Sequence, residues 1–497
     1  MKPYCVVALA GVLALAGCTP GPNYRRPAAV VPPEFKEQPP ADFKEAQGWK
    51  QAQPNDGQIK GRWWEIYNDA DLNALEEPVA INNQNVLQAE AQYREAVAAV
   101  KIVRSGLYPT VSSAPSITES RTPASTGVAG GMRSSFSLPI SASWEPDLWG
   151  NIRRSVTAAA AQAQASAADL ENARLLYQSE LAQDYFALHG LDGDVDLLTR
   201  TVRSYAEYLD LTHNRFAGGI ASDLDVAQAE AQLYAAQTEL ADFGVARAQM
   251  EHAIAVLAGK PPAAVTVTAK ILQTPPPPVP IALPSALLER RPDIASNERL
   301  AAAANEQIGI AEAAFFPSLT LAATAGFQAS RITTWLSWPS RFFSVGPTLA
   351  ETIFDAGRRR AQVSQNLAAY DAAVAAYRQS VLTAFQQVED SLSTLRVLAE
   401  ESVVADESVK SADRALAVST AQYRAGTTAY LTVLTAQATA LAAERTQIDL
   451  LTRRHEASVQ LVVNLGGGWD NSQLPTKPDV IKTAKRPQPP AAPAKTQ

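Results

Sequence analysis

The chain has 497 residues, enough for a large core or for two or three domains. It carries 50 acidic residues against 43 basic ones, a net charge of −7, and its lysines and arginines are scattered rather than clustered. This charge pattern excludes nucleic acid as a partner. No run reaches the roughly 20 apolar residues that a membrane-spanning helix needs.

The N-terminus has the features of a secretory signal. A short apolar run follows Lys2 and ends in "LAGC" at Cys18, which resembles the lipobox of bacterial lipoproteins. We therefore expect residues 1–17 to be a signal peptide and Cys18 to become the acylated N-terminus. Cleavage would also remove Cys5, so the mature chain would hold no internal disulfide. Threonine rather than aspartate at position 19 favours transport to the outer membrane.

Proline divides the rest of the chain. An extended linker is expected at 18–60, a second linker at 261–284 and a disordered tail at 471–497. The long proline-free stretches between them have room for very long helices. Neither proline nor glycine occurs between Gly357 and Gly426, and a helix of that length reaches about 100 Å.

The apolar residues of this last stretch recur every three or four positions. Such spacing predicts a helix that packs lengthwise against others as a coiled coil, and a long helix in an ordinary bundle is the alternative. The seam consists of Val363, Leu367, Tyr370, Val374, Tyr377, Val381, Phe385, Val388, Leu392 and Leu395.

Two parts of the chain repeat each other. The stretch "RFAGGIASDLDVAQAEAQL" from Arg215 aligns with "QYRAGTTAYLTVLTAQATA" from Gln422 at an offset of 207. A duplicated unit of about 200 residues predicts two structural repeats, 61–260 and 285–470. Each is expected to hold a helix, a strand pair, a long helix, a glycine turn and another long helix.

Alternating sequences predict the strand pairs, at about 109–145 and 317–353. In "FSLPISASW" apolar residues alternate with serine and proline, which is typical of a strand with two unlike faces. Four such strands could cross a membrane but could not close a barrel, whereas three chains would supply 12. A soluble sheet with one polar face is the alternative. The predicted fold is mainly α with a trimeric 12-stranded membrane β-barrel, whose lipid-facing residues include Phe136, Leu138, Ile140, Trp144 and Phe343.

Several motifs together resemble one family. They are "WEPDLWG" at Trp144, "ERRPDI" at Glu289, "FFPSL" at Phe315, "IFDAGRRRAQV" at Ile353 and "YRAGTTAYLTVLTAQ" at Tyr423. Over about residues 18–470 the chain resembles the outer-membrane efflux channels of the TolC and OprM type, in particular the lipoprotein branch called the NodT family. The resemblance implies a homotrimer with a helical periplasmic tunnel. It also implies a passive exit duct for drugs or other toxic compounds, served by a periplasmic adaptor and an inner-membrane pump of the resistance-nodulation-division type.

Two other functions are weighed against this one. A type I protein-secretion channel shares the fold, although the lipobox favours the pump-associated branch. A periplasm-facing lipoprotein enzyme would need a site, but no GxSxG, HExxH or P-loop motif occurs. No catalytic residue, metal or cofactor is therefore expected, and the histidines lie far apart without metal-ligand spacing: His189, His213, His252 and His455.

The glycine turns of the two repeats are expected to form the periplasmic tips where the adaptor docks. Gly219 and Gly426 allow the tight reversals, and a helix-capping role alone is the alternative. The residues expected to point outward beside them are Arg215, Phe216, Tyr423 and Arg424.

The same tips are expected to hold the gate. The OprM-like pattern reads YLxVLDAQ, where a leucine and an aspartate form successive rings. Here "YLTVLTAQ" keeps Leu431 but has Thr435 in place of the aspartate. We expect Leu431 to be the main closure and any negative rim to come from Asp223 or Asp225, which could instead be ordinary solvated turn residues.

Overall fold

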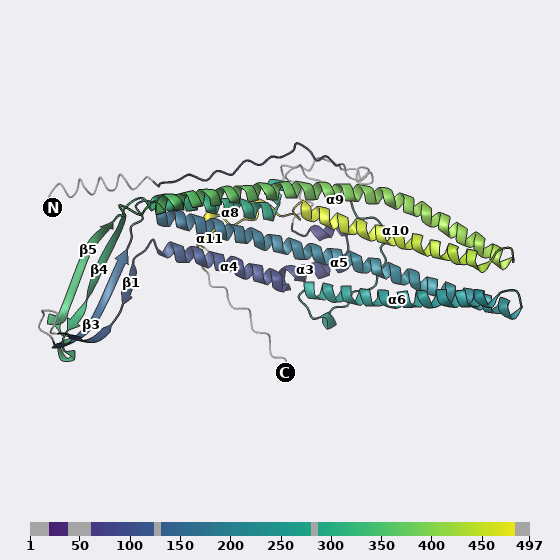
Figure 1. Cartoon of the computed structure of the whole chain (residues 1–497), viewed down its shortest axis with the longest axis horizontal. Helices are drawn as coiled ribbons and strands as arrows, with labels where there is room; N and C mark the ends of the chain where they lie inside the picture. Colours follow the sequence, from purple (N-terminus) through teal and green to yellow (C-terminus); the bar gives the residue numbers. More distant parts are fainter. Residues whose placement is uncertain (1–18, 38–60, 124–130, 280–286, 483–497) are drawn as a thin grey trace.

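The computed structural model describes residues 19–37, 61–123, 131–279 and 287–482. It is an elongated body of helices with a small sheet at one end and two helical turns at the other (Figure 1). The α-helices are α3 Ala70–Asn82, α4 Gln84–Ser105, α5 Asn151–Ala217, α6 Asp223–Leu257, α7 Leu287–Arg290, α8 Pro292–Ala313, α9 Arg358–Arg424, α10 Tyr430–Asn464 and α11 Lys477–Lys482. Short 3-10 helices are η1 Trp63–Tyr67, η3 Pro262–Ala264, η5 Ile332–Thr334, η6 Trp338–Ser340 and η7 Asn471–Gln473.

Two very long helices dominate the body, as the proline-free stretches predict. Helices α5 and α9 each have 67 residues, and the shorter partners α6 and α10 each have 35. A 67-residue helix is about 100 Å long. The starts and ends of α9 and α10 follow those of α5 and α6 at the offset seen in the sequence repeat, for example 151 with 358 and 257 with 464. The two halves of the described chain therefore fold alike.

Each long helix is flanked by a 22-residue helix on its sheet side and a 35-residue helix on its tip side. Helix α5 packs against α4 and α6, and α9 packs against α8 and α10. The junction between the flanking helices is made by one side chain in each repeat. Asn83 donates to the Leu257 carbonyl at 2.9 Å, and the equivalent Arg291 donates to the Asn464 carbonyl at 3.1 Å. Each contact satisfies a carbonyl at a helix end, which no intrahelical donor reaches.

The main hydrophobic core lies around these junctions, at mid-height of the body. It gathers residues from η1, α3, α5, α9 and α10, with Trp63, Leu181 and Val388 among the fully buried side chains. The predicted seam of α9 is buried only in part. From Tyr377 onward its members are buried, but toward the sheet Leu367 is 45% exposed. The other sheet-side members, Val363, Tyr370 and Val374, are half-buried, so the single chain covers this half of the seam only in part.

The sheet has four rows of strands. Strands β3 Gly131–Trp144, β4 Ser318–Ala329 and β5 Arg341–Ala350 form three of them. The fourth is broken into β1 Thr110–Ser113 and β2 Ser116–Thr122, both paired with β3. The order is β1 and β2, then β3, β4 and β5, all antiparallel. The prediction of four strands is confirmed, with the break at Pro115, which has no N–H for the ladder.

An N-terminal strap, residues 19–37, runs along the outside of the helices (Figure 1). Thr19 lies against Gly150, where α5 begins beside the sheet. Buried Arg154 donates to two strap carbonyls, at 3.0 and 3.2 Å. Farther along, the Glu389 carboxylate accepts two strap amides at 2.7 and 2.8 Å. The strap thus begins at the sheet end and reaches mid-height of α9.

Several predicted features lie outside the described residues. These are the signal peptide with Cys18, most of the linker 18–60, part of the linker 261–284 and the end of the tail from 483. The prediction of a disordered tail is wrong over 471–482, because η7 and α11 form there and Val480 of α11 is fully buried. Across the described ranges, none of the helices is both long and apolar enough to cross a membrane.

Candidate functional site

The sheet has one apolar and one polar face. Residues directly opposite in neighbouring strands share a face. The ladder pairs Leu138 with Phe327 and Ile140 with Ala325, and Ala325 pairs in turn with Phe343. The five residues predicted to face lipid, Phe136, Leu138, Ile140, Trp144 and Phe343, therefore lie on one face.

Serine and threonine occupy the opposite face. Ser141 and Thr324 face each other there, with their hydroxyls 3.2 Å apart. The apolar face is uncovered in the single chain, where the Phe343 side chain is 80% exposed. An exposed apolar surface spread over several strands marks a site of membrane or protein contact.

At the other end of the body, two turns close the helical hairpins α5–α6 and α9–α10. Gly219 and Gly426 follow the helix ends with φ of 72° and 76°. The Gly219 and Ile220 amides donate to carbonyls of the last turn of α5, at 2.9 and 2.8 Å. Gly426 and Thr427 repeat the arrangement on α9 at 3.0 Å each. Both turns are thus Schellman motifs, in which glycine takes the left-handed conformation.

The tip residues do not all point outward. Phe216 and Arg424 are exposed, but the Tyr423 side chain is 4% exposed and packs against Tyr430 with ring centroids 5.5 Å apart. Arg215 is half-buried and donates to the Tyr423 carbonyl at 3.0 Å. The expectation that Tyr423 faces outward is wrong, because its ring fills the space between the two hairpins.

The two hairpins begin their return helices differently. Ser222 caps α6: its Oγ accepts the Asp225 amide at 3.2 Å, and the Asp225 carboxylate accepts the Ser222 amide at 2.9 Å. This capping box satisfies two amides at the helix start. At the equivalent place in α10 stands Ala429, which has no capping side chain. Asp223 is exposed.

The predicted gate residues lie on the first turns of α10. Leu431 is 55% exposed. Thr435 lies one turn farther on, and its hydroxyl donates to the Leu431 carbonyl at 3.1 Å and the Thr432 carbonyl at 2.9 Å. Thr435 is therefore engaged with its own helix and brings no charge to this level.

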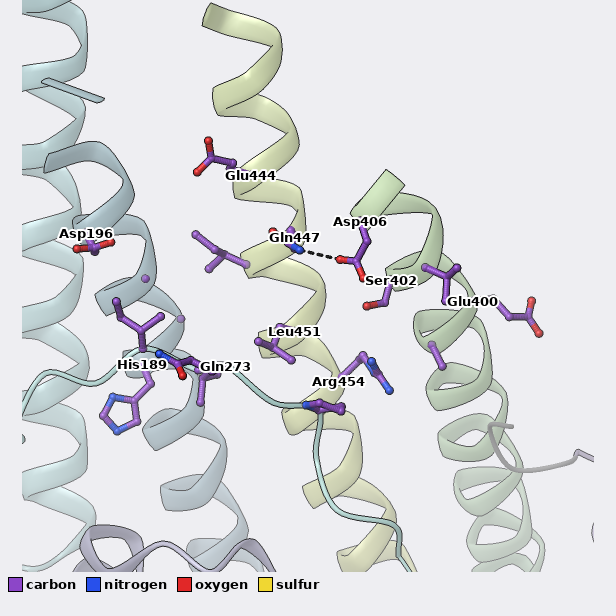
Figure 2. A pocket seen from close by; sticks show the side chains of 18 of the residues that line it. His189, Asp196, Gln273, Glu400, Ser402, Asp406, Glu444, Gln447, Leu451 and Arg454 are labelled. Carbon is purple, nitrogen blue, oxygen red and sulfur yellow. Dashed lines mark hydrogen bonds between the residues drawn. The ribbon is translucent and has the colours of Figure 1, made fainter. Parts of the chain in front are cut away.

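A cavity of about 770 Å³ lies between α5, α9 and α10. Charges of both signs line it, including Glu444 and Arg454, and Asp406 accepts a hydrogen bond from Gln447 at 2.7 Å. Figure 2 shows His189 and Ser402 on opposite sides of this cavity, with α10 between them. His189 and Ser402, among the described residues that line this cavity, therefore do not form the nucleophile–base pair that hydrolytic chemistry of the serine type needs.

His189 belongs to a buried cluster of charges beside this cavity. Its Nδ1 lies 2.9 Å from the Asp192 carboxylate, which also accepts from Arg247 at 2.6 Å and from the Lys270 amide at 3.0 Å. Burial alone would raise the pKa of Asp192, but the hydrogen bonds from His189, Lys270 and Arg247 outweigh it and lower the pKa. The cluster ties α5 to α6 and to the segment after η3. No group suited to hold a metal ion occurs among the described residues.

A match to a family model identifies the family of this chain. The model of the outer membrane efflux protein family matches the chain twice, over residues 77–260 and 283–467. The chain belongs to this family. Outer membrane protein OprJ of Pseudomonas aeruginosa is 32% identical over 485 residues, which cover 95% of this chain and 98% of OprJ. Toluene efflux pump outer membrane protein TtgF of Pseudomonas putida is 29% identical over 472 residues, 94% of this chain and 97% of TtgF.

Solved structures agree with the sequence relatives. The outer-membrane channel OprN matches with a TM-score of 0.81 at 30% identity, over 91% of this chain and 100% of that one. The outer membrane protein VceC of Vibrio cholerae matches with a TM-score of 0.75 at 27% identity, over 83% and 100%. This efflux protein is therefore an outer-membrane channel component of an efflux system with a periplasmic tunnel, and it is not an enzyme. The comparisons do not favour the secretion-channel alternative.

Sequence reasoning missed three features of the efflux protein. The contact of Arg215 with Tyr423 joins residues 208 positions apart, and no local pattern reveals it. The strap contacts of Arg154 and Glu389 are equally remote in sequence. The capping box could have been predicted from the sequence, since Ser222 and Asp225 stand three residues apart at the start of a helix.

Proposed function

We propose that three copies of this efflux protein close into one cylinder, a passive exit duct for small molecules driven by an inner-membrane pump. The observation that carries the proposal is the sheet with two free edges. In the described single chain, β5 pairs only with β4, and β1 and β2 pair only with β3. In a membrane each unpaired backbone group costs several kcal/mol, so the edges need partners. Pairing β5 of one copy with β1 and β2 of the next gives 12 rows and removes every edge.

The apolar face of the sheet, with Phe136, Leu138, Ile140, Trp144 and Phe343, would then face lipid. The serines and threonines of the opposite face would line a watery lumen, as in barrels of this size. Light scattering of the detergent-purified protein tests the assembly. A trimer is expected, and a stable monomer would contradict the shared cylinder.

Two anchors are proposed to hold the protein in the outer membrane, the lipid on Cys18 and the sheet. Cys18 would carry the lipid, and Thr19, next to it in sequence, lies beside the sheet end of α5, which suits an anchor in the same membrane. Cys18→Ser should lose the acyl mass in mass spectrometry but stay in the membrane fraction, because the sheets also hold the protein there. A mature N-terminus elsewhere in the chain would contradict the lipobox.

The tips are proposed to dock a periplasmic adaptor of a resistance-nodulation-division pump. Phe216 and Arg424 are the exposed members of the predicted set, and Arg215, Tyr423, Gly219 and Gly426 would shape the surface that carries them. Phe216→Ser with Arg424→Ser should weaken copurification with the adaptor without changing trimer yield. Unchanged copurification and export would contradict docking at these tips.

The gate is proposed at Leu431, with cation preference from the first tip. Asp223 is exposed, whereas Asp225 is engaged in the capping box, so Asp223 is the better rim residue. In planar bilayers Leu431→Ala should raise single-channel current, and Asp223→Asn should lower cation preference more than Thr435→Val does. Full cation selectivity in Asp223→Asn would remove the rim from the proposal and leave the duct standing.

The exported compounds are proposed to be small toxic or apolar molecules, by analogy with the toluene efflux relative TtgF. Deleting the gene should sensitise cells to several such compounds at once.

We also propose that the chain divides into two structural repeats, 61–260 and 285–470.

A further inference from the structure

The charged residues of the strand region gather at one end of the sheet. Between positions 110 and 144 and between 318 and 350 they are Glu119, Arg121, Arg133, Arg331 and Arg341. Arg121 pairs with Met132 and Arg341 with Phe327, both near the strand ends farthest from the helices. Arg331 stands in the turn between β4 and β5, at the same end (Figure 1). The remaining length of the strands carries no charge.

The strand register separates these arginines by face. Arg341 pairs with Phe327, and Arg121 shares its strand face with Ile117, which pairs with Phe136. Both arginines thus lie on the apolar face. Arg133 lies on the polar face, because it pairs with Ser120, next to Arg121 in the strand.

In the part of the chain that the structure describes, the two arginines on the apolar face have no acidic partner. Among the described residues no ion pair involves Arg121 or Arg341, and both are exposed. Glu119 shares the face but leaves a net positive charge there. The Arg341 guanidinium lies over the Trp338 ring, 4.0 Å from its centroid. Tryptophan beside arginine at the rim of an apolar surface is typical of a membrane interface.

A hollow adjoins Arg341. It has a volume of about 370 Å³, and Ser134, Ser330, Ser340 and Arg341 are among the residues that line it. The Ser340 hydroxyl already donates to the Thr334 carbonyl at 2.7 Å. A guanidinium with several hydroxyls suits the oxygens of a phosphate group, which accept hydrogen bonds in a fork geometry.

We propose that Arg121 and Arg341 bind the phosphate groups of lipid headgroups in the leaflet on the far side of the membrane from the helices. The inference rests on the proposed function, in which the apolar face meets lipid. The uncharged length of the strands sets the acyl region, and the arginines mark the level of the headgroups. Trp338 holds the Arg341 side chain at that level.

The size of the effect follows from the attraction of basic side chains to anionic lipid. Each arginine at a charged membrane surface strengthens binding about fivefold. Because β2 and β5 lie at opposite edges of the sheet, each arginine makes its own site, and removing both should weaken binding of a phosphate-bearing lipid about fivefold at each one. Arg133 offers a matched control, because it has the same charge at the same end of the sheet but on the polar face.

The test uses the full-length assembly in detergent as wild type, R121Q/R341Q and R133Q. Each is titrated by native mass spectrometry with a bisphosphorylated lipid A and with the same glycolipid after removal of its phosphates. Wild type and R133Q should bind the phosphorylated lipid alike, and R121Q/R341Q should bind it at the weak level of the dephosphorylated one. Equal binding by wild type and R121Q/R341Q would overturn the proposal, as would an equal loss in R133Q.

Two further measurements distinguish lipid binding from binding of free phosphate and from failure of the channel itself. Inorganic phosphate is added as a competitor: millimolar concentrations should displace little lipid, and displacement at lipid-like concentrations would assign the site to free anions instead. Bilayer conductance of the wild type is recorded in parallel. A wild type that conducts in bilayers but binds the phosphorylated and dephosphorylated lipids equally would contradict this inference alone. A wild type that fails to insert into bilayers would contradict the proposed function.

Discussion

The guanidinium of Arg215, at the end of α5, lies 4.6 Å from the ring centroid of Tyr423, at the end of α9. The same side chain donates to the Tyr423 carbonyl. The two hairpins of one chain are therefore joined at their far ends by a cation–π contact and a hydrogen bond. Such a pair stabilises the contact by about 2 kcal/mol in a partly desolvated place.

Loss of this contact should loosen the tips. We expect Arg215→Gln to speed amide hydrogen exchange in the last turns of α5 and α9 by about tenfold or more, since about 2 kcal/mol is removed. Single-channel current should rise in parallel if the tips narrow the duct. Arg424→Gln is the control, because this neighbouring arginine is exposed and meets Arg215 through its backbone carbonyl, which the substitution keeps. Equal exchange in both variants would show that Arg215 does not hold the hairpins together.

The turn glycines should differ sharply from their neighbours. Gly219→Ala forces a side chain into a left-handed conformation at a cost of about 1 kcal/mol, so the Ile220 amide should exchange faster. Gly218 has φ of −79° and no crowding within 3.4 Å, and Gly218→Ala should leave exchange unchanged or slower. Exchange mass spectrometry of the tip peptide compares them, and identical profiles would contradict the Schellman turn.

A buried carboxyl in α3 makes stability depend on pH. Burial raises the pKa of Glu76 well above its ordinary 4.5, and neither of its oxygens has a hydrogen-bond partner in the described structure. Below pH 4.5 the carboxyl is protonated whether the chain is folded or not. Between pH 4.5 and the raised pKa of the folded chain, only the unfolded chain releases the proton, so the free energy of unfolding falls as pH rises through this window.

Glu76→Gln keeps the shape and removes the titration. The variant should melt higher than the wild type at pH 7, and the difference should vanish as pH falls toward 4. Glu77→Gln serves as control, since Glu77 is half exposed and pairs with Arg62 at the surface, where ion pairs contribute little. Parallel melting curves for Glu76→Gln and wild type at every pH would contradict a buried neutral carboxyl.

Two helical glycines should respond in opposite directions. A Cβ on Gly190 of α5 would overlap the Thr452 side chain of α10, and overpacking of this kind costs about 1–3 kcal/mol. Gly244 of α6 has open space around it, and alanine there should stabilise the helix by about 0.5–1 kcal/mol. Thermal unfolding should therefore rank Gly244→Ala above wild type and Gly190→Ala below it. The reverse order would place the α5–α10 contact elsewhere.

The sequence predicts the features that depend on local pattern. Absence of proline and glycine predicts the long helices, and alternation predicts the strands and their two faces. The glycines predict the turns, since only a left-handed residue closes each helix there. The burial of Tyr423 could not be predicted from the sequence, because its partner Arg215 belongs to the other repeat. The junctions were equally hidden, since asparagine at 83 and arginine at 291 perform the same task with unlike chemistry.

The two hairpins are alike in length and unlike in their caps, and this bears on stoichiometry. Around a threefold axis, six tips would alternate between the capped start at Ser222 and the uncapped start at Ala429. The ring would be sixfold in outline and threefold in chemistry. A partner that binds in three copies would contact one kind of tip. A partner that binds in six copies would have to bind both kinds of tip, in two different ways.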